Sequence, residues 1–342
     1  MTERSSRCTQ CLLLVLVVVL IGGCAPPVDP VERALDNYGT RIARLLEVEP
    51  FAVGDPQLRL PRLRELTLPI TQRRINWVEF AELHQCDLGD LAGYRNSGLG
   101  RMQTPIERLR QDQALLVAGR RCLQTIPSAP DWLPELLEEK RRDLTRLSFN
   151  AVLAAEEMRD WLGPAPNRST ETAEATLNRL ADQLGQDLET LDVAALLDDL
   201  ALLRTQQPAG PAIGRWQTWA DWLVPVAAAL SSEATRVCRT RAATPRAKGL
   251  RNVFMKYYIG EVQPLLAEEV QVHRPWVEAL NRLVRVMPVR SRAFDSWFAE
   301  AVSEGHETSA WMRLRSLGLD HAEAWLHLAD TCNLSLMARP PR

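Results

Sequence analysis

Apolar residues recur at helical spacing along nearly the whole chain from Val31 onward. Between residues 31 and 46 they occupy one face of a 3.6-residue period, and charged residues fall on the other faces. No Asn-Gly turn joins alternating strands, and no repeat is visible. The pattern predicts an all-α domain over residues 31–342, an irregular bundle of about ten helices without a significant sheet. Further amphipathic stretches cover residues 74–92, 105–124, 134–162, 171–206, 215–241, 248–286, 291–304, 307–318 and 321–333.

Several of these stretches have recognisable borders. The run Thr104–Glu107 supplies a capping hydroxyl, a proline for the first turn and a glutamate that can reach back. Residues 320–323 are a looser version of this box and predict another helix start. Pro225 and Pro264 lie inside long apolar patterns, where we expect each to kink or divide its helix.

The N-terminus has the features of a bacterial export signal. Basic residues precede an unbroken apolar run, residues 11–21, which as a helix spans roughly 16 Å, about half of a bilayer core. The sequence Ile21-Gly22-Gly23-Cys24 then resembles a lipobox, which implies removal of a signal peptide, residues 1–23, and lipidation of Cys24. An ordinary cleaved signal with Cys24 incidental is the less favoured interpretation.

The residues after Cys24 indicate the membrane to which the mature protein is attached. The second mature residue is Ala25, whereas aspartate there commonly marks lipoproteins retained at the inner membrane. We therefore expect the periplasmic face of the outer membrane. Residues 24–30 form a short proline-rich tether, which would hold the body within about 20 Å of the lipid surface. The membrane is thus an expected partner, contacted through the lipid on Cys24.

The mature chain keeps an even number of further cysteines, which fits an oxidising compartment. Three pairings are open to Cys86, Cys122, Cys238 and Cys332. Cys86 with Cys122 and Cys238 with Cys332 is favoured, because the first pair closes a short loop and the second ties the C-terminal segment back. A metal site is less favoured, since no Cys-x-x-Cys pair or suitably spaced histidine accompanies these residues. We expect neither a metal nor a cofactor.

The charge pattern argues against nucleic acid as a partner, because the formal net charge is −2. Of the 41 basic residues only Lys140, Lys248 and Lys256 are lysines. Arginine forks for phosphate or lipid A are one interpretation. Codon bias is favoured, because the arginines are scattered among acidic residues.

Two segments, residues 163–169 and 206–211, are rich in proline and glycine. Either could separate two helical lobes, 31–162 and 171–337, but their shortness favours surface connections. Residues 51–72, where prolines break an Arg-Leu pattern, are too long for a plain turn. Such loops are often either functional or ordered by packing onto the body.

The most unusual segment is Arg95-Asn96-Ser97-Gly98-Leu99-Gly100-Arg101, just before the helix expected from Thr104. Two glycines and a serine at this position can direct backbone N–H groups at an anion, and the arginines add charge. Neither a dinucleotide fingerprint nor a serine-hydrolase elbow fits the context. The favoured alternative is a structural loop with positive-φ glycines and arginines paired to nearby acids. The candidate ligand residues are Arg95, Asn96, Ser97, Gly98, Gly100 and Arg101.

Trp216, Trp219 and Trp222 form a stripe at helical spacing. A stripe of this kind suits a membrane-surface or carbohydrate-binding face, or else the core. Core packing is favoured, because the neighbouring positions continue as apolar residues.

Three blocks of this sequence resemble one protein family. They are Ile75–Leu88, Tyr94–Arg101 with Cys122-Leu123 after it, and His321-Ala322-Glu323-Ala324-Trp325 to Cys332-Asn333-Leu334. The family is an uncharacterised one of gammaproteobacterial lipoproteins, domain of unknown function 3080. Relatives would have a serine near position 104, where Thr104 keeps the cap. The resemblance implies an outer-membrane lipoprotein and supplies no mechanism.

These observations favour a binding or scaffolding component in cell-envelope assembly or maintenance, with an envelope protein as a further partner. The alternative is an envelope enzyme that acts on a glycan such as peptidoglycan through two carboxylates. Adjacent acidic pairs occur at residues 156–157, 198–199 and 268–269, but neighbours on a helix diverge by about 100°. Solvated helix faces are their usual explanation, so no residue is assigned a catalytic role.

Overall fold

The computed structural model describes residues 29–51, 54, 58–73, 76–86, 88–164, 169–240 and 242–336. These residues form helices and their connections with no strand among them, which confirms the all-α prediction. The signal region and Cys24 lie outside the described residues. No helix in the described part of the chain is both long and apolar enough to cross a membrane.

The α-helices in chain order are α2 (Pro30–Leu46), α3 (Leu63–Leu66), α4 (Trp77–Leu83), α5 (Gly89–Asn96), α6 (Pro105–Thr125), α7 (Leu133–Val152), α8 (Glu156–Leu162), α9 (Glu174–Leu184), α10 (Val193–Thr205), α11 (Gly210–Val237), α12 (Pro245–Val253), α13 (Gln263–Arg285), α14 (Arg292–Ala301) and α15 (Ala310–Thr331). Two 3-10 turns, η1 (His84–Cys86) and η2 (Gly100–Met102), and a π-helix, η3 (Phe254–Val262), complete them.

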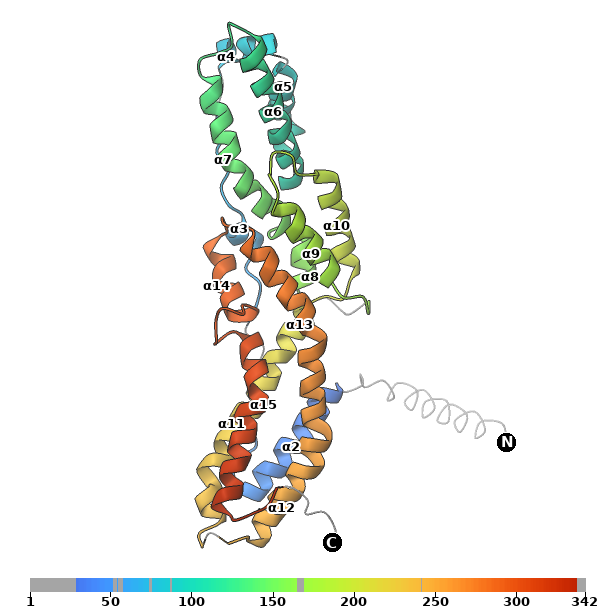
Figure 1. Ribbon diagram of the computed structural model, residues 1–342, viewed down its shortest axis with the longest axis vertical. Coiled ribbons are helices and arrows are strands. Elements are labelled where there is room, and N and C mark those ends of the chain that lie inside the picture. The colour runs from blue at the N-terminus through green and yellow to red at the C-terminus, as the bar shows by residue number, and fades with distance from the viewer. Residues whose placement is uncertain are drawn as a thin grey trace, which may run out of the picture.

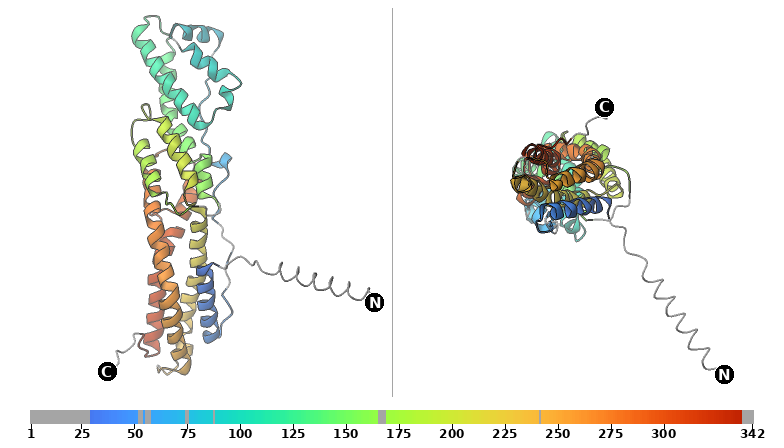
Figure 2. Two further views of the ribbon diagram at one scale, coloured as in Figure 1. Left: turned by 90° about the vertical axis from the view of Figure 1, so that its right-hand side faces the viewer. Right: turned by 90° about the horizontal axis from the view of Figure 1, so that it is seen from below.

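The helices stack along one long axis into a rod, which is narrow when seen from its end (Figure 1, Figure 2). One end consists of α4 to α7. The middle contains α8 to α10 with α3 and α14, and the other end contains α2, α11, α12 and α15 with much of α13 (Figure 1). The first described helix, α2, packs against α11, α12 and η3, and α9 packs against α13. Segments far apart in the sequence therefore pack together in the same part of the rod.

The core between α11, α13 and α15 is rich in aromatic residues. Trp216 and Trp219 are fully buried and Trp222 nearly so, so the core interpretation of this stripe is confirmed and the surface-face interpretation is wrong. The Trp216 ring stacks on Trp276 and packs against Trp311, with ring centroids 5.5 and 5.1 Å away. Each such buried side chain contributes on the order of 2–3 kcal/mol to folding.

Two disulfides join helix ends. Cys86 in η1 is bonded to Cys122 in α6, and Cys238 after α11 is bonded to Cys332 after α15. The structure thus contains the two pairings that the sequence favoured. Disulfides of this kind are typical of domains in an oxidising, extracytoplasmic compartment.

The expected helix borders are correct only in part. At α6 the Thr104 hydroxyl accepts from Glu107 N at 3.4 Å, and the Glu107 carboxylate accepts from Thr104 N at 2.8 Å. At residues 320–323 no helix begins, because α15 runs through them. Asp320 is an interior position that accepts from the Ser316 hydroxyl at 3.0 Å, and the neighbouring His321 is buried.

The two prolines behave differently. Pro225 does not divide α11, because buried residues on both sides of it pack the helix against its neighbours. Pro264 stands in the first turn of α13, directly after the π-helix η3. The single stretch expected at 248–286 therefore divides into α12, η3 and α13.

The described part of segment 51–72 is held against the body by hydrogen bonds. Leu58 N donates to Gln217 Oε1 at 3.3 Å, and Leu68 exchanges two bonds with the Asn150 amide at 2.8 and 2.9 Å. The connection 206–211 is fastened as well, since the Trp161 indole donates to Gln207 O at 2.8 Å. Both segments are therefore ordered by packing.

Candidate functional site

A cleft of about 690 Å³ opens between α5, α6 and the extended chain before α4. We call it the arginine cleft, because guanidinium and amide groups make up most of its lining. Its lining residues are Gln72, Arg73, Arg95, Asn96, Gly100, Arg101, Gln103 and Arg108. Four of the six candidate ligand residues named from the sequence therefore lie on one surface.

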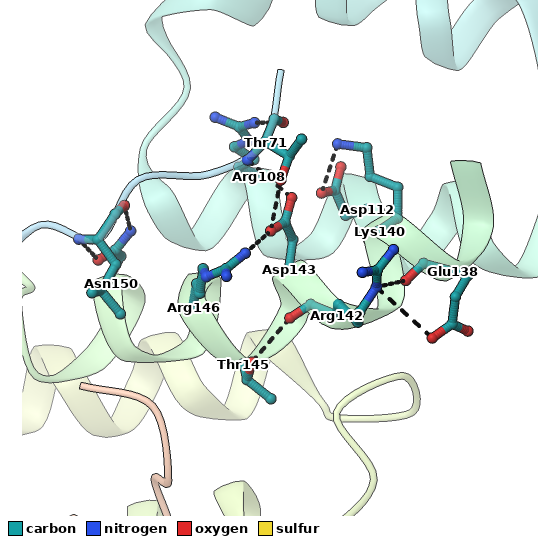
Figure 3. A network of polar contacts seen from close by, with 11 residues as sticks. Thr71, Arg108, Asp112, Glu138, Lys140, Arg142, Asp143, Thr145, Arg146 and Asn150 are labelled. Carbon is teal, nitrogen blue, oxygen red and sulfur yellow. Dashed lines mark hydrogen bonds and ion pairs between the residues drawn. The ribbon is translucent and has the colours of Figure 1, made fainter. Parts of the chain in front are cut away.

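The extended chain at one side of the cleft is positioned by α7 (Figure 3). The Asp143 carboxylate accepts from Thr71 N at 3.1 Å and from the Thr71 hydroxyl at 3.3 Å. Arg146 neutralises the same carboxylate at 2.8 Å. Because Thr71 is fixed in this way, the next two residues, Gln72 and Arg73, are held at the edge of the cleft.

The loop after α5 satisfies its own backbone. The Ser97 hydroxyl donates to Tyr94 O at 2.6 Å and accepts from Gly100 N at 3.0 Å. Arg101 N donates to Ser97 O at 3.2 Å. The N–H groups of Gly100 and Arg101 are therefore engaged within the loop and are not free to bind an anion in the cleft.

The glycines of this loop do not serve the purpose expected of them. Neither Gly98 nor Gly100 has a positive φ, which corrects the turn interpretation. Gly100 is needed for close packing instead, because an added Cβ would overlap Tyr94 O. Gly98 has open space around it and does not line the cleft.

A buried ion cluster lies behind Arg95, next to the cleft. The Asp112 side chain is fully buried in α6, where its Oδ1 accepts from Arg95 Nη1 at 2.5 Å. The Lys140 ammonium on α7 lies 3.7 Å from Asp112 Oδ2, with its side chain 4% exposed (Figure 3). At that distance the pair is not hydrogen bonded, and Nζ has no hydrogen-bond partner within the described structure.

Burial makes these charges costly. It lowers the pKa of Lys140, an effect that Asp112 opposes and that Arg95 reinforces. Burial likewise lowers the pKa of Arg108, and Arg95 adds to this effect. A charged group taken out of water without full compensation costs several kcal/mol. The cluster therefore has an excess of positive charge that an incoming anion would neutralise.

The outer arginines have weaker attachments. Arg101 donates to Asn96 O at 3.1 and 3.3 Å, and Arg108 donates to Thr71 O at 3.4 Å. Arg73 lies 3.7 Å from Glu79 and 3.6 Å from Glu135. Such half-exposed pairs contribute little to folding, so these side chains can exchange partners for a ligand at small cost.

Sequence reasoning missed Asp112 and Lys140, although a signal was present. Lys140 stands four residues after Leu136 and four before Leu144, on the apolar face of its helix. Asp112 follows Leu109 by three residues in the same manner. Charged residues at core positions of two neighbouring helices indicate a buried pair.

The adjacent carboxylate pairs do not form a shared site. Asp199 accepts from Arg179 and Gln183, both at 2.8 Å. Glu269 accepts from Arg215 at 2.9 and 3.0 Å and lies 3.1 Å from His273 Nε2. Glu156 lies 3.9 Å from Arg204 on the surface. One carboxylate of each pair is thus engaged with a nearby cation.

No group of three or more His, Cys, Asp or Glu residues in the described ranges could hold a metal ion. Residues 35–336 match the model of a family described as a protein of unknown function, DUF3080. Neither a curated protein nor a solved structure matches the chain.

Proposed function

For this chain, which belongs to the DUF3080 family of unknown function, we propose a role as a lipid-anchored envelope protein that binds an anionic ligand in the arginine cleft. The lipid is attached to Cys24, and the body works at the periplasmic face of the outer membrane. Binding serves envelope assembly or maintenance. The lipobox and the two disulfides support this location.

The observation that carries the binding role is the unpartnered ammonium of Lys140. Buried polar groups in folded proteins nearly always have hydrogen-bond partners, and a charged group left without one costs more than a neutral one. The Lys140 ammonium is such a charged group, and it lines a small chamber that shares Arg73, Arg95 and Asn96 with the arginine cleft. A negatively charged group from outside supplies the missing partner.

The binding test uses full mature protein in detergent at low ionic strength, titrated with inorganic phosphate by calorimetry. We expect saturable binding that weakens as salt is added, because Arg101 and Arg108 are partly exposed. Arg101→Gln removes a lining guanidinium and should weaken phosphate binding at least tenfold. The matched control is Arg142→Gln, an exposed arginine on α7 outside the cleft, which should bind as wild type.

Two outcomes contradict the binding role. One is no saturable binding of phosphate or of a small carboxylate such as acetate. The other is an equal loss of affinity in the Arg101 and Arg142 variants, which would show a general charge effect rather than a site.

The anchor is tested separately by Cys24→Ser in cells labelled with palmitate. We expect the variant to lose the label and to accumulate as unprocessed precursor, because the cysteine sulfur is the acceptor. Labelling that persists in the variant contradicts the lipidation at this residue and leaves the cleft proposal untouched.

A further inference from the structure

A smaller, apolar chamber adjoins the arginine cleft. Arg73, Arg95 and Asn96 line both spaces, so they stand at the boundary between them. The chamber has a volume of about 60 Å³. The remaining chamber walls are Leu83, Leu88, Ala92, Leu115, Leu136 and Lys140.

The size of the chamber restricts what enters it. One water-sized group needs about 10–15 Å³ of such space, so the chamber admits on the order of four to six non-hydrogen atoms. An acyl chain is too large, and so is an aromatic ring together with a carboxylate. A carboxylate with the carbon that bears it and one methyl group has the right size.

The charges at the chamber select a monoanion. Lys140 and Arg95 carry two positive charges, and Asp112 carries one negative charge. The third cation of the chamber lining, Arg73, already lies near Glu79 and Glu135. One carboxylate therefore neutralises the set, and it gives the Lys140 ammonium the hydrogen bond that it lacks. A phosphate dianion would leave a net negative charge next to Asp112 among leucine side chains, which is costly.

The outer cleft suits a peptide chain. Gln72, Asn96 and Gln103 supply amide groups that both donate and accept hydrogen bonds, as a peptide backbone requires. The volume of 690 Å³ lies within the range of sites for ligands of several residues' size. A peptide bound with its carboxyl end in the chamber therefore has apolar walls around its last residue and the amides of the cleft beside its backbone.

We propose that the cleft and chamber together capture the C-terminal carboxylate of a peptide whose last residue is alanine or similarly small. This inference rests on the proposed anion-binding function and names its ligand class. Two sources share this chemistry, protein chains with an L-residue at the end and cell-wall peptides with a D-residue at the end.

The experiment uses full mature protein in detergent and calorimetric titration with defined probes. They are N-acetyl-alanyl-alanine in its L,L and D,D forms, the C-terminal amide of each, N-acetyl-alanyl-phenylalanine, and inorganic phosphate. We expect at least one free acid to bind at least tenfold more tightly than its amide, because the amide lacks the charge. The phenylalanine probe should bind at least tenfold more weakly, since its ring does not fit the chamber together with the carboxylate.

A variant separates the chamber from the cleft. Ala92→Leu adds a branched side chain to the chamber wall and should abolish the preference for the free acid while phosphate binding in the outer cleft persists. Ala114→Leu, the same substitution at an exposed position of α6, is the matched control and should bind the dipeptide as wild type.

The outcomes distinguish the two proposals. Phosphate binding without a preference for either free acid overturns the peptide inference and leaves the anion-binding function standing. Loss of binding of every probe overturns both. A preference for the D,D form identifies cell-wall peptides as the source, and a preference for the L,L form identifies protein C-termini.

Discussion

The Tyr38 hydroxyl and His321 Nε2 lie 2.6 Å apart in a buried hydrogen bond that joins α2 to α15, 283 residues later in the chain. The Trp325 indole donates to the same hydroxyl at 2.9 Å. Burial lowers the pKa of His321 to about 4. A neutral imidazole can accept the Tyr38 proton at Nε2, whereas an imidazolium can only donate there, so protonation of His321 would reverse this bond and bury a positive charge.

The lowered pKa predicts acid sensitivity. The folded-state value lies below the ordinary value of 6.5, so the stabilisation is complete above about pH 6.5 and is lost as the pH falls toward 4. The difference corresponds to about 3 kcal/mol. The nearest aromatic neighbours do not titrate in this range, because burial raises the pKa of Tyr258 to about 12 and that of Tyr38 well above 10.

Replacement of the histidine separates its effect from that of the Asp and Glu residues, which titrate in the same pH range. His321→Gln keeps a polar side chain and removes the ionisation. Urea unfolding at pH 7 and pH 4.5 should show a smaller loss of unfolding free energy in the variant than in the wild type. The same loss in both proteins would show that His321 does not cause the acid sensitivity.

Asp112 is predicted to be the residue of the ion cluster that folding needs most. Asp112→Asn leaves the buried Lys140 and the partly buried Arg95 without this counter-charge, and the unfolding free energy should fall by about 3–5 kcal/mol. Lys140→Met should cost less, because Asp112 keeps its bond to Arg95. Asp198→Asn, at an exposed position of α10, is the control and should change stability by less than about 0.5 kcal/mol. Equal losses in the Asp112 and Lys140 variants would contradict this order.

The extent to which the sequence predicted this structure depended on how local each feature is. The cap at Thr104 uses residues three positions apart, so it was visible in the sequence and is present in the structure. The helix start predicted at residues 320–323 rested on the same local rule. It was wrong, because the packing of α15 along α11 outweighs the local signal. The contact between Asp112 and Lys140 depends on how α6 lies against α7, which no local pattern specifies.

The disulfides predict a chemical and a thermodynamic result. Denatured mature protein should show no free thiol before reduction, and four accessible thiols without reductant would refute both bonds. The loops span 36 and 94 residues, so the chain-entropy model assigns them about 4 and 5 kcal/mol. A Cys238→Ala and Cys332→Ala double variant should therefore lose more stability than the corresponding Cys86 and Cys122 variant, as measured by urea unfolding.

A close contact between α2 and α11 gives the last prediction. An added Cβ at Gly39 would overlap the indole of the nearly buried Trp222, whereas a Cβ at Gly214 meets nothing within 4 Å. Alanine favours a helix over glycine by about 0.5–1 kcal/mol, and overpacking costs about 1–3 kcal/mol. Gly214→Ala should therefore raise the unfolding free energy, and Gly39→Ala should lower it. In a Trp222→Leu background the ring is gone, so Gly39→Ala should become neutral or stabilising. A Gly39 penalty that persists there would place its cause in the helix itself rather than in the contact with α11.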